Sequence, residues 1–125
     1  LDRNPNGFFL LVENEGSDTY SHRNLDREVL VAEMLEFDDA VGIALSYFRE
    51  HPETLIVVTS DHETGGITLK GDEDRNIVME YATTSHTAAL VPLFAIGPGS
   101  AQLGGLKRND EIGKILIGLL NPSSN

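Results

Sequence analysis

The sequence predicts an α/β fold that contains part of a mostly parallel sheet flanked by helices. Two short apolar runs, at residues 8–12 and 55–58, have the composition of strands that are buried on both faces. Between them, residues 26–50 repeat apolar side chains in steps of three and four, as one face of a long helix does. A strand, a helix and a second strand in this order predict a βαβ unit with a right-handed crossover.

The first predicted strand ends at a carboxylate and leads into a polar loop. Residues 3–7 read Arg-Asn-Pro-Asn-Gly, which is typical of a turn, and the apolar residues 8–12 follow them. Glu13 ends the strand, and the polar loop after it contains Asp18 and His22, four residues apart. If a helix begins within this loop, these two side chains share one helical face and can bind one ion.

The second predicted strand ends at an Asp-His pair. Pro52 stops the long helix, and residues 55–58 then lead to Asp61 and His62. Ligands bind outside the carboxyl ends of strands in open α/β sheets, so this pair is placed for chemistry. Adjacent side chains of a strand point to opposite faces, so the two can share one ion only where the chain leaves the strand. The simpler alternative is that Asp61 caps a turn and His62 has no special role.

The rest of the chain predicts a hairpin, a third strand and a closing helix. Residues 67–83 hold two short apolar runs around a charged turn, which indicates an excursion from the sheet. The chain returns through His86 to an apolar run at residues 90–96, where Pro92 indicates a strand that starts late or lies near an edge. Asn109 is a suitable N-cap for a helix that ends before Pro122.

Composition narrows the possible partners and metal ligands. The 125 residues have the length of one domain, and 20 Asp and Glu against 9 Lys and Arg give a net charge of -11. A field of this sign repels nucleic acid and anionic membranes, and no apolar stretch approaches the roughly 20 residues of a membrane span. Cysteine is absent, so a zinc site must use His with Asp or Glu. The chain begins with Leu1 rather than Met, which suggests a piece of a longer protein.

Three of the four histidines lie in polar loops near carboxylate or hydroxyl groups: His22, His62 and His86. Histidine with carboxylate and no thiolate is typical of catalytic zinc, whereas the oxygen-only surroundings of Glu13 favour magnesium. His51, at the end of the long helix, has the position of an ordinary surface histidine. The sequence therefore predicts a shared metal site, against the alternative that each histidine is an unrelated surface residue.

Three stretches resemble the C-terminal half of an alkaline phosphatase: FFLLVE with an Asp and a His after it, VVTSDHETGG, and SHTAALVPLFAIGPG. The resemblance runs from about residue 7 to residue 99 and includes the helical segment EMLEFDDAVGIAL. It implies an alkaline-phosphatase-like fold, incomplete on its N-terminal side, of which residues 1–125 are a single C-terminal portion. By position, one zinc would take Asp18, His22 and His86, a second zinc would take Asp61 and His62, and magnesium would take Glu13.

The resemblance also implies hydrolysis of phosphate monoesters by a two-zinc plus magnesium site, in a homodimer that is periplasmic or secreted. Two cations about 4 Å apart can stabilise the attacking and leaving oxygens of an in-line displacement. The family's nucleophilic serine, within an Asp-Ser-Ala stretch, and its phosphate-binding arginine lie upstream. No Asp-Ser-Ala occurs here, and neither Arg3 nor Arg23 has the context of that arginine. We therefore expect little or no turnover from this chain alone.

Two departures from the family pattern leave the metal at Glu13 open. Asn14-Glu15-Gly16 follows this glutamate where the family has Gly, and Ser17 stands where it has Ile. Two other functions also remain possible. Phosphodiesterases, cofactor-independent phosphoglycerate mutases and sulfatases use a related Asp and His layout, although Glu13 with Thr64-Gly65-Gly66 favours a phosphatase. The second alternative is a non-catalytic metal-binding half-domain that completes another chain.

Overall fold

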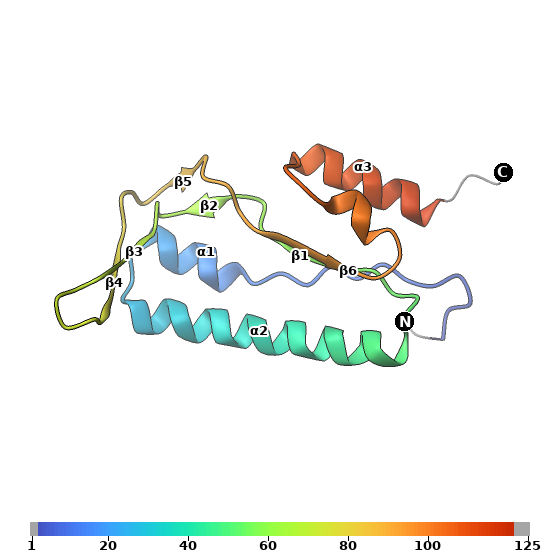
Figure 1. Cartoon of the computed structure of the whole chain (residues 1–125), viewed down its shortest axis with the longest axis horizontal. Coiled ribbons are helices and arrows are strands. Elements are labelled where there is room, and N and C mark those ends of the chain that lie inside the picture. The colour runs from blue at the N-terminus through green and yellow to red at the C-terminus, as the bar shows by residue number, and fades with distance from the viewer. Residues whose placement is uncertain (1–2, 122–125) are drawn as a thin grey trace.

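The computed structural model describes residues 3–121 and has an α/β architecture, as predicted (Figure 1). Within that range its helices are α1 (Glu15–His22), α2 (Arg27–Glu50), α3 (Asn109–Leu120) and the short 3-10 helix η1 (Ser100–Leu103). Its strands are β1 (Ile56–Thr59), β2 (Glu63–Thr64), β3 (Thr68–Gly71), β4 (Ile77–Glu80), β5 (His86–Thr87) and β6 (Leu93–Ile96).

The strands of residues 3–121 form three separate antiparallel pairs, so the mostly parallel sheet stays a prediction. They pair as β1 with β6, β2 with β5, and β3 with β4, and the last is the hairpin predicted at residues 67–83. Residues 8–12 are extended but belong to no ladder within the described range, so they do not pair with β1 there. An apolar run favours an extended chain, whereas pairing needs a neighbouring strand, and within the described range that neighbour of β1 is β6.

The strands predicted to be buried on both faces are instead partly open to solvent. The exposed fraction reaches 78% for Leu11 in the first apolar run, and β1 in the second run is half-buried up to the exposed Thr59. In β6, which pairs with β1, Phe94 is 65% exposed as well. The buried side chains of the described range are Leu30, Leu103, Ser21 and Thr64. The chain therefore has a small core and a large exposed apolar surface.

The helices flank the β1–β6 pair. The long helix predicted at residues 26–50 is α2, and it packs against β1, while α1 packs against α2 and β2. In Figure 1, α1 and α2 lie on one side of the β1–β6 pair and α3 lies on the other. The β2–β5 pair lies next to α1, and these elements carry three of the six predicted metal ligands, namely Asp18, His22 and His86. Across residues 3–121, no helix has the length and apolarity that a membrane span requires.

Two element boundaries show how local chemistry sets the ends. Strand β6 begins at Leu93, directly after Pro92, as the missing N–H of proline predicts. Helix α3 begins at Asn109, so its N-cap is Arg108 rather than the predicted Asn109. The carboxylate of Glu111 accepts a hydrogen bond of 2.8 Å from the Arg108 N–H, and this closes the first turn one residue earlier than expected.

Candidate metal centre

Helix α1 holds Asp18 and His22 one turn apart. Asn14 caps this helix, because its side-chain oxygen accepts a hydrogen bond of 3.0 Å from the Ser17 N–H. The helix that the sequence left conditional therefore starts at Glu15, before both ligands. Nε2 of His22 lies 3.4 Å from a carboxylate oxygen of Asp18, so the two side chains share one face as the spacing predicts.

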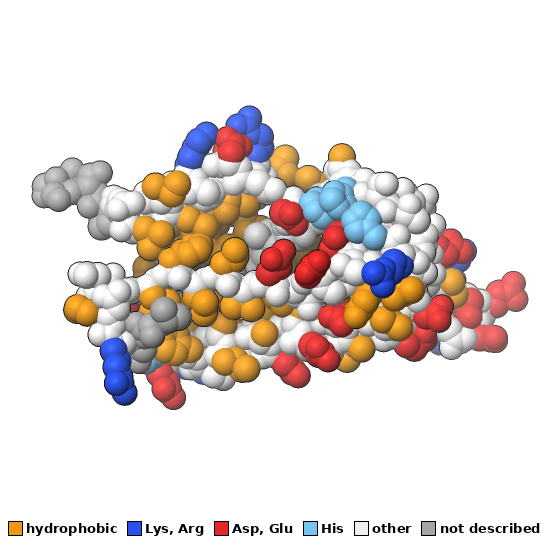
Figure 2. Space-filling view, turned by 180° about the vertical axis from the view of Figure 1, so that it is seen from behind, with side chains coloured by type: hydrophobic (Ala, Val, Ile, Leu, Met, Phe, Trp, Pro, Cys, Tyr) orange, Lys and Arg blue, Asp and Glu red, His pale blue; other side chains and the backbone are white. Residues whose placement is uncertain are grey.

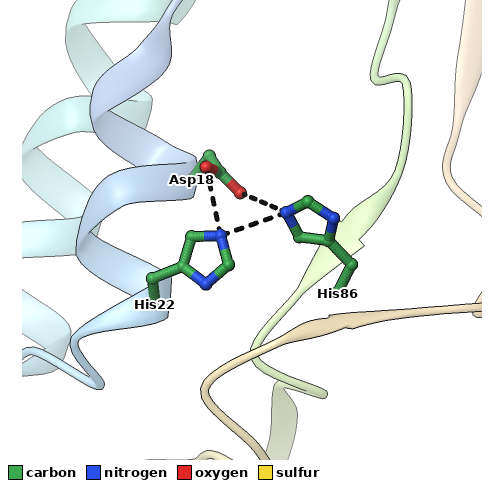
Figure 3. Close-up of side chains that lie close together, drawn as sticks. All are labelled: Asp18, His22 and His86. Atoms are coloured by element: carbon green, nitrogen blue, oxygen red, sulfur yellow. Dashed lines mark hydrogen bonds and ion pairs between the residues drawn. The ribbon is translucent and has the colours of Figure 1, made fainter.

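Strand β5 brings His86 to the same place. Nε2 of His86 lies 3.0 Å from Nε2 of His22 and 3.5 Å from the other carboxylate oxygen of Asp18. Figure 3 shows the three side chains converging from α1 and from the strand that carries His86. Within the described part of the chain, they form the one group of three potential ligands whose atoms all lie within 4.8 Å of one another.

The spacing in this group fits a tetrahedral zinc ion. Zinc bonds of about 2.0–2.1 Å at tetrahedral angles place neighbouring ligand atoms about 3.3 Å apart. Nε2 of His22 and Nε2 of His86 are 3.0 Å apart, and they lie 3.4 and 3.5 Å from different carboxylate oxygens of Asp18. In addition, the carbonyl oxygen of Thr84 lies 2.6 Å from Nδ1 of His22 and accepts a hydrogen bond from its N–H, so the lone pair of the neutral ring is on Nε2. That is the atom that faces the other two ligands.

His62 lies directly against this group, and Asp61 adjoins His62. Strand β1 ends at Thr59, so both residues are beyond the pleat, and Nε2 of His62 is 3.4 Å from a carboxylate oxygen of Asp61. The His62 ring stacks on His86, with ring centroids 3.5 Å apart. Asn109 of α3 donates a hydrogen bond of 2.8 Å to the Asp61 carbonyl, so its side chain fixes this segment instead of capping the helix. The structure therefore places the second predicted pair beside the first group.

Glu13 does not join the other predicted ligands. It is exposed in the extended segment before α1 and is outside the group of three ligands found among residues 3–121. The carboxylate near this helix start is that of Glu33, which accepts a hydrogen bond of 3.4 Å from the side chain of Asn14. A methyl group at Gly16 would lie 2.1 Å from the same carboxylate, so a side chain there would require the Glu33 carboxylate to move. The role of Glu13 as a magnesium ligand stays a prediction.

The environment of Asp18 keeps it ionised. A hydrogen bond from the hydroxyl of Thr64 lowers the pKa of Asp18 most. Burial acts in the opposite direction, and the nearby imidazoles of His22, His86 and His62 lower the pKa further. The carboxylate is therefore in its ligand form at neutral pH.

Glu63 holds the turn after β2 against β5, and the sequence did not predict this role. Its carboxylate accepts hydrogen bonds of 3.1 Å from the N–H groups of Gly66 and Ile67, and another from the hydroxyl of Thr87. Burial raises the pKa of Glu63, but these hydrogen bonds outweigh burial and leave the pKa below its ordinary value. Thr87 follows His86, so Glu63 fixes the strand that carries a predicted ligand.

A cavity adjoins the Asp-His pair. It has a volume of about 300 Å³, and its lining includes Asp61, His62, residues 105–107 and Asn109. On the molecular face shown in Figure 2, histidines and carboxylates gather next to a hollow lined with apolar side chains. The candidate ligands therefore border an open space of the size that a small molecule needs.

The comparisons with known proteins agree on one family. A family model described as alkaline phosphatase matches residues 1–82. The alkaline phosphatase of Gadus morhua is 34% identical over 113 residues, which cover 87% of this chain and 23% of that protein. The solved alkaline phosphatase of the Antarctic bacterium TAB5 has a TM-score of 0.78 at 36% identity, over 89% of this chain and 34% of that chain.

A mutant of the TAB5 enzyme, solved with magnesium bound in its M3 site, gives a TM-score of 0.76 at 34% identity. The match covers 90% of this chain and 35% of the mutant. The chain thus spans about a quarter of the curated relative and about a third of the solved enzymes. Because the family model matches 82 of 125 residues, the chain belongs to the alkaline phosphatase family.

Proposed function

We propose that this chain supplies most metal ligands of a two-zinc phosphomonoesterase site, with magnesium bound near Glu13. One zinc takes Asp18, His22 and His86, and the second takes Asp61 and His62. The observation that carries the proposal is the convergence of the first three side chains, whose nearest ligand atoms lie 3.0, 3.4 and 3.5 Å apart, with Asp18 facing the two histidines through different oxygens. These distances are close to those between tetrahedral zinc ligands. A mutant of the TAB5 enzyme binds magnesium in its M3 site, which supports the proposal that magnesium is one of the metals of this family.

The side chains of the chain would prepare the site in three ways. The carboxylates of Asp18 and Asp61 offset cationic charge, and the Thr84 carbonyl holds His22 with its Nε2 lone pair toward the ion. The stacked rings of His62 and His86 keep the two ligand groups adjacent. When bound, the two zinc ions would stabilise negative charge on the attacking and leaving oxygens of a phosphate ester. The cavity of about 300 Å³ beside Asp61 is open to such a substrate.

The rest of the active site belongs, in this proposal, to a longer protein. The chain lacks the Asp-Ser-Ala stretch of the family and spans about a quarter of the Gadus morhua enzyme. The exposed apolar side chains of residues 8–12 and β6 support further strands beside β1, which would give the parallel sheet expected from the sequence. Residues 1–125 would then be one portion of a single domain. A homodimer and a periplasmic or secreted location rest on the resemblance alone and stay predictions.

Zinc titration of the chain and of His86→Ala tests the ligand assignment. We expect the chain to bind zinc in isothermal titration calorimetry, and we expect His86→Ala to lose one zinc equivalent or at least about 10-fold in affinity, since it removes a ligand. His51→Ala is the matched control, because His51 lies at the end of α2 beside Glu53 and outside the ligand group. Equal zinc binding by the chain and by His86→Ala would contradict the assignment.

Turnover measurements separate the phosphatase from its alternatives. The chain alone should not hydrolyse p-nitrophenyl phosphate above the buffer rate, because the proposed nucleophile lies outside it. A protein that joins this chain to the upstream half of the TAB5 enzyme should hydrolyse the monoester, and bis(p-nitrophenyl) phosphate far more slowly. A preference for the diester would favour a phosphodiesterase instead. Zinc binding without turnover in the joined protein would favour the non-catalytic half-domain.

A further inference from the structure

We propose that Thr64 is a positioning residue whose single hydroxyl orients Asp18 and His62 together, and so links the two zinc groups. This inference rests on the proposed function and adds to it a residue that binds no metal. Thr64 lies in β2, next to α1 and directly opposite His86 in the β2–β5 ladder. It is one of the few buried side chains of the described range, with 9% of its surface exposed.

The hydrogen bonds of Thr64 follow from the chemistry of its hydroxyl. Its Oγ1 donates to a carboxylate oxygen of Asp18 at 2.5 Å and lies 3.2 Å from Nδ1 of His62. A hydroxyl has one proton, and an ionised carboxylate can only accept, so this proton goes to Asp18. The lone pairs of the oxygen can then accept a hydrogen bond from the imidazole N–H. Nδ1 of His62 therefore carries the hydrogen of the neutral ring.

This arrangement leaves the other ring nitrogen of His62 free to bind a cation. Nε2 keeps its lone pair and faces Asp61, the second ligand of its group, at 3.4 Å. The same hydroxyl also binds one oxygen of Asp18, which is a ligand of the other group. Asp18 lies 46 residues before Thr64 in the sequence. Hydrogen-bond partners of metal ligands set ligand orientation, and their loss commonly costs 10–100-fold in metal affinity. Thr64 does this for two ligands at once.

Two substitutions separate the hydroxyl from the shape of the side chain. Thr64→Val keeps the size and the branched shape but removes the hydroxyl, whereas Thr64→Ser keeps the hydroxyl and removes the methyl group. Thr68→Val is the matched control, since Thr68 is an exposed threonine of β3, the next strand along the chain. Circular dichroism of each variant reports whether the fold is retained.

The first readout needs no metal. Long-range ¹H–¹⁵N spectra of the metal-free chain at about pH 8.5, well above the ordinary histidine pKa of about 6.5, identify the protonated nitrogen of each ring. We expect His62 to be protonated on Nδ1 in the chain and in Thr64→Ser, and to become a mixture of tautomers in Thr64→Val. His22, held by the Thr84 carbonyl, should stay protonated on Nδ1 in every variant and serves as the internal reference.

The second readout is zinc affinity by calorimetry. We expect Thr64→Val to bind zinc about 10-fold more weakly or worse, and Thr64→Ser and Thr68→Val to stay within about 3-fold of the unmodified chain. An unchanged His62 tautomer in Thr64→Val, or an equal loss of affinity in Thr64→Ser, would overturn the inference. If the unmodified chain binds no zinc, the proposed function fails, while the tautomer spectra still decide the role of Thr64.

Discussion

Replacing Gly65 with alanine should disrupt the turn that sets β2 beside β5. Gly65 has φ +92°, a backbone conformation that side chains rarely adopt. An alanine Cβ there would lie 2.8 Å from a ring carbon of Tyr81, closer than real contacts allow. The ring cannot move away freely, because the Tyr81 hydroxyl donates a hydrogen bond of 2.9 Å to the carbonyl of Leu25. Both the backbone and the side chain therefore oppose the substitution.

The expected loss of stability is large for a chain of this size. Backbone strain at such a φ costs about 1–3 kcal/mol. Overpacking of a filled site costs about 1–3 kcal/mol more. The sum, about 2–6 kcal/mol, compares with a total free energy of unfolding of about 5–15 kcal/mol for typical domains. Gly65 also donates its N–H to the Ser85 carbonyl at 3.0 Å, so its displacement should move His86 and weaken zinc binding as well.

Urea unfolding followed by circular dichroism measures this loss. The matched control is Gly71→Ala in β3, where φ is not positive and no atom lies within 4 Å of the added methyl group. We expect the control to stay within about 0.5 kcal/mol of the unmodified chain, as surface substitutions usually do. If Gly65→Ala unfolds at the same urea concentration as the control and keeps full zinc affinity, the turn does not hold the ligands in place.

Two further predictions concern single contacts outside the ligand group. Tyr81→Phe removes the hydrogen bond to the Leu25 carbonyl and should lower the free energy of unfolding by about 0.5–1.5 kcal/mol in the same urea assay; no change would mean that this bond adds nothing to stability. Hydrogen bonds from Arg108, which has the larger effect, and from Lys114 lower the pKa of Asp110 to about 2. The stabilisation from this lowered pKa should be complete above the ordinary Asp pKa of about 3.9 and lost as the pH falls through about 2. A ¹³C carboxyl titration with a midpoint near 3.9 would contradict this prediction.

The helices and the ligand spacing could be predicted because they depend on local sequence. The repeat of apolar residues in α2 and the four-residue step from Asp18 to His22 each describe one helical surface, so the sequence alone places them. Likewise, Pro92 marks the start of β6 through its missing N–H. These features need no knowledge of what lies next to them in space.

The sheet and the burial could not be predicted in the same way because they depend on distant partners. The apolar run at residues 8–12 indicates an extended chain, yet nothing in those residues says which strand pairs with them, and within residues 3–121 none does. The approach of His86 to His22, 64 residues away, also comes from packing of α1 against β2. Their polar surroundings predicted a shared metal site, but only the resemblance to the family assigned His22 and His86 to the same ion.

The polar residues of the Asp-His-Glu-Thr run explain how such a short strand pair can hold the ligand group. A ladder of two residues on each strand is too short to be stable by its backbone hydrogen bonds alone. Glu63 adds three hydrogen bonds that tie the turn to β5, and Thr64 ties β2 to Asp18 on α1. Because successive side chains of a strand point to opposite faces, Glu63 and Thr64 bind partners on opposite sides of β2. The run therefore contains a proposed ligand, His62, and the two residues after it hold the other ligands in place. Glu63 fixes the strand of His86, and Thr64 binds Asp18.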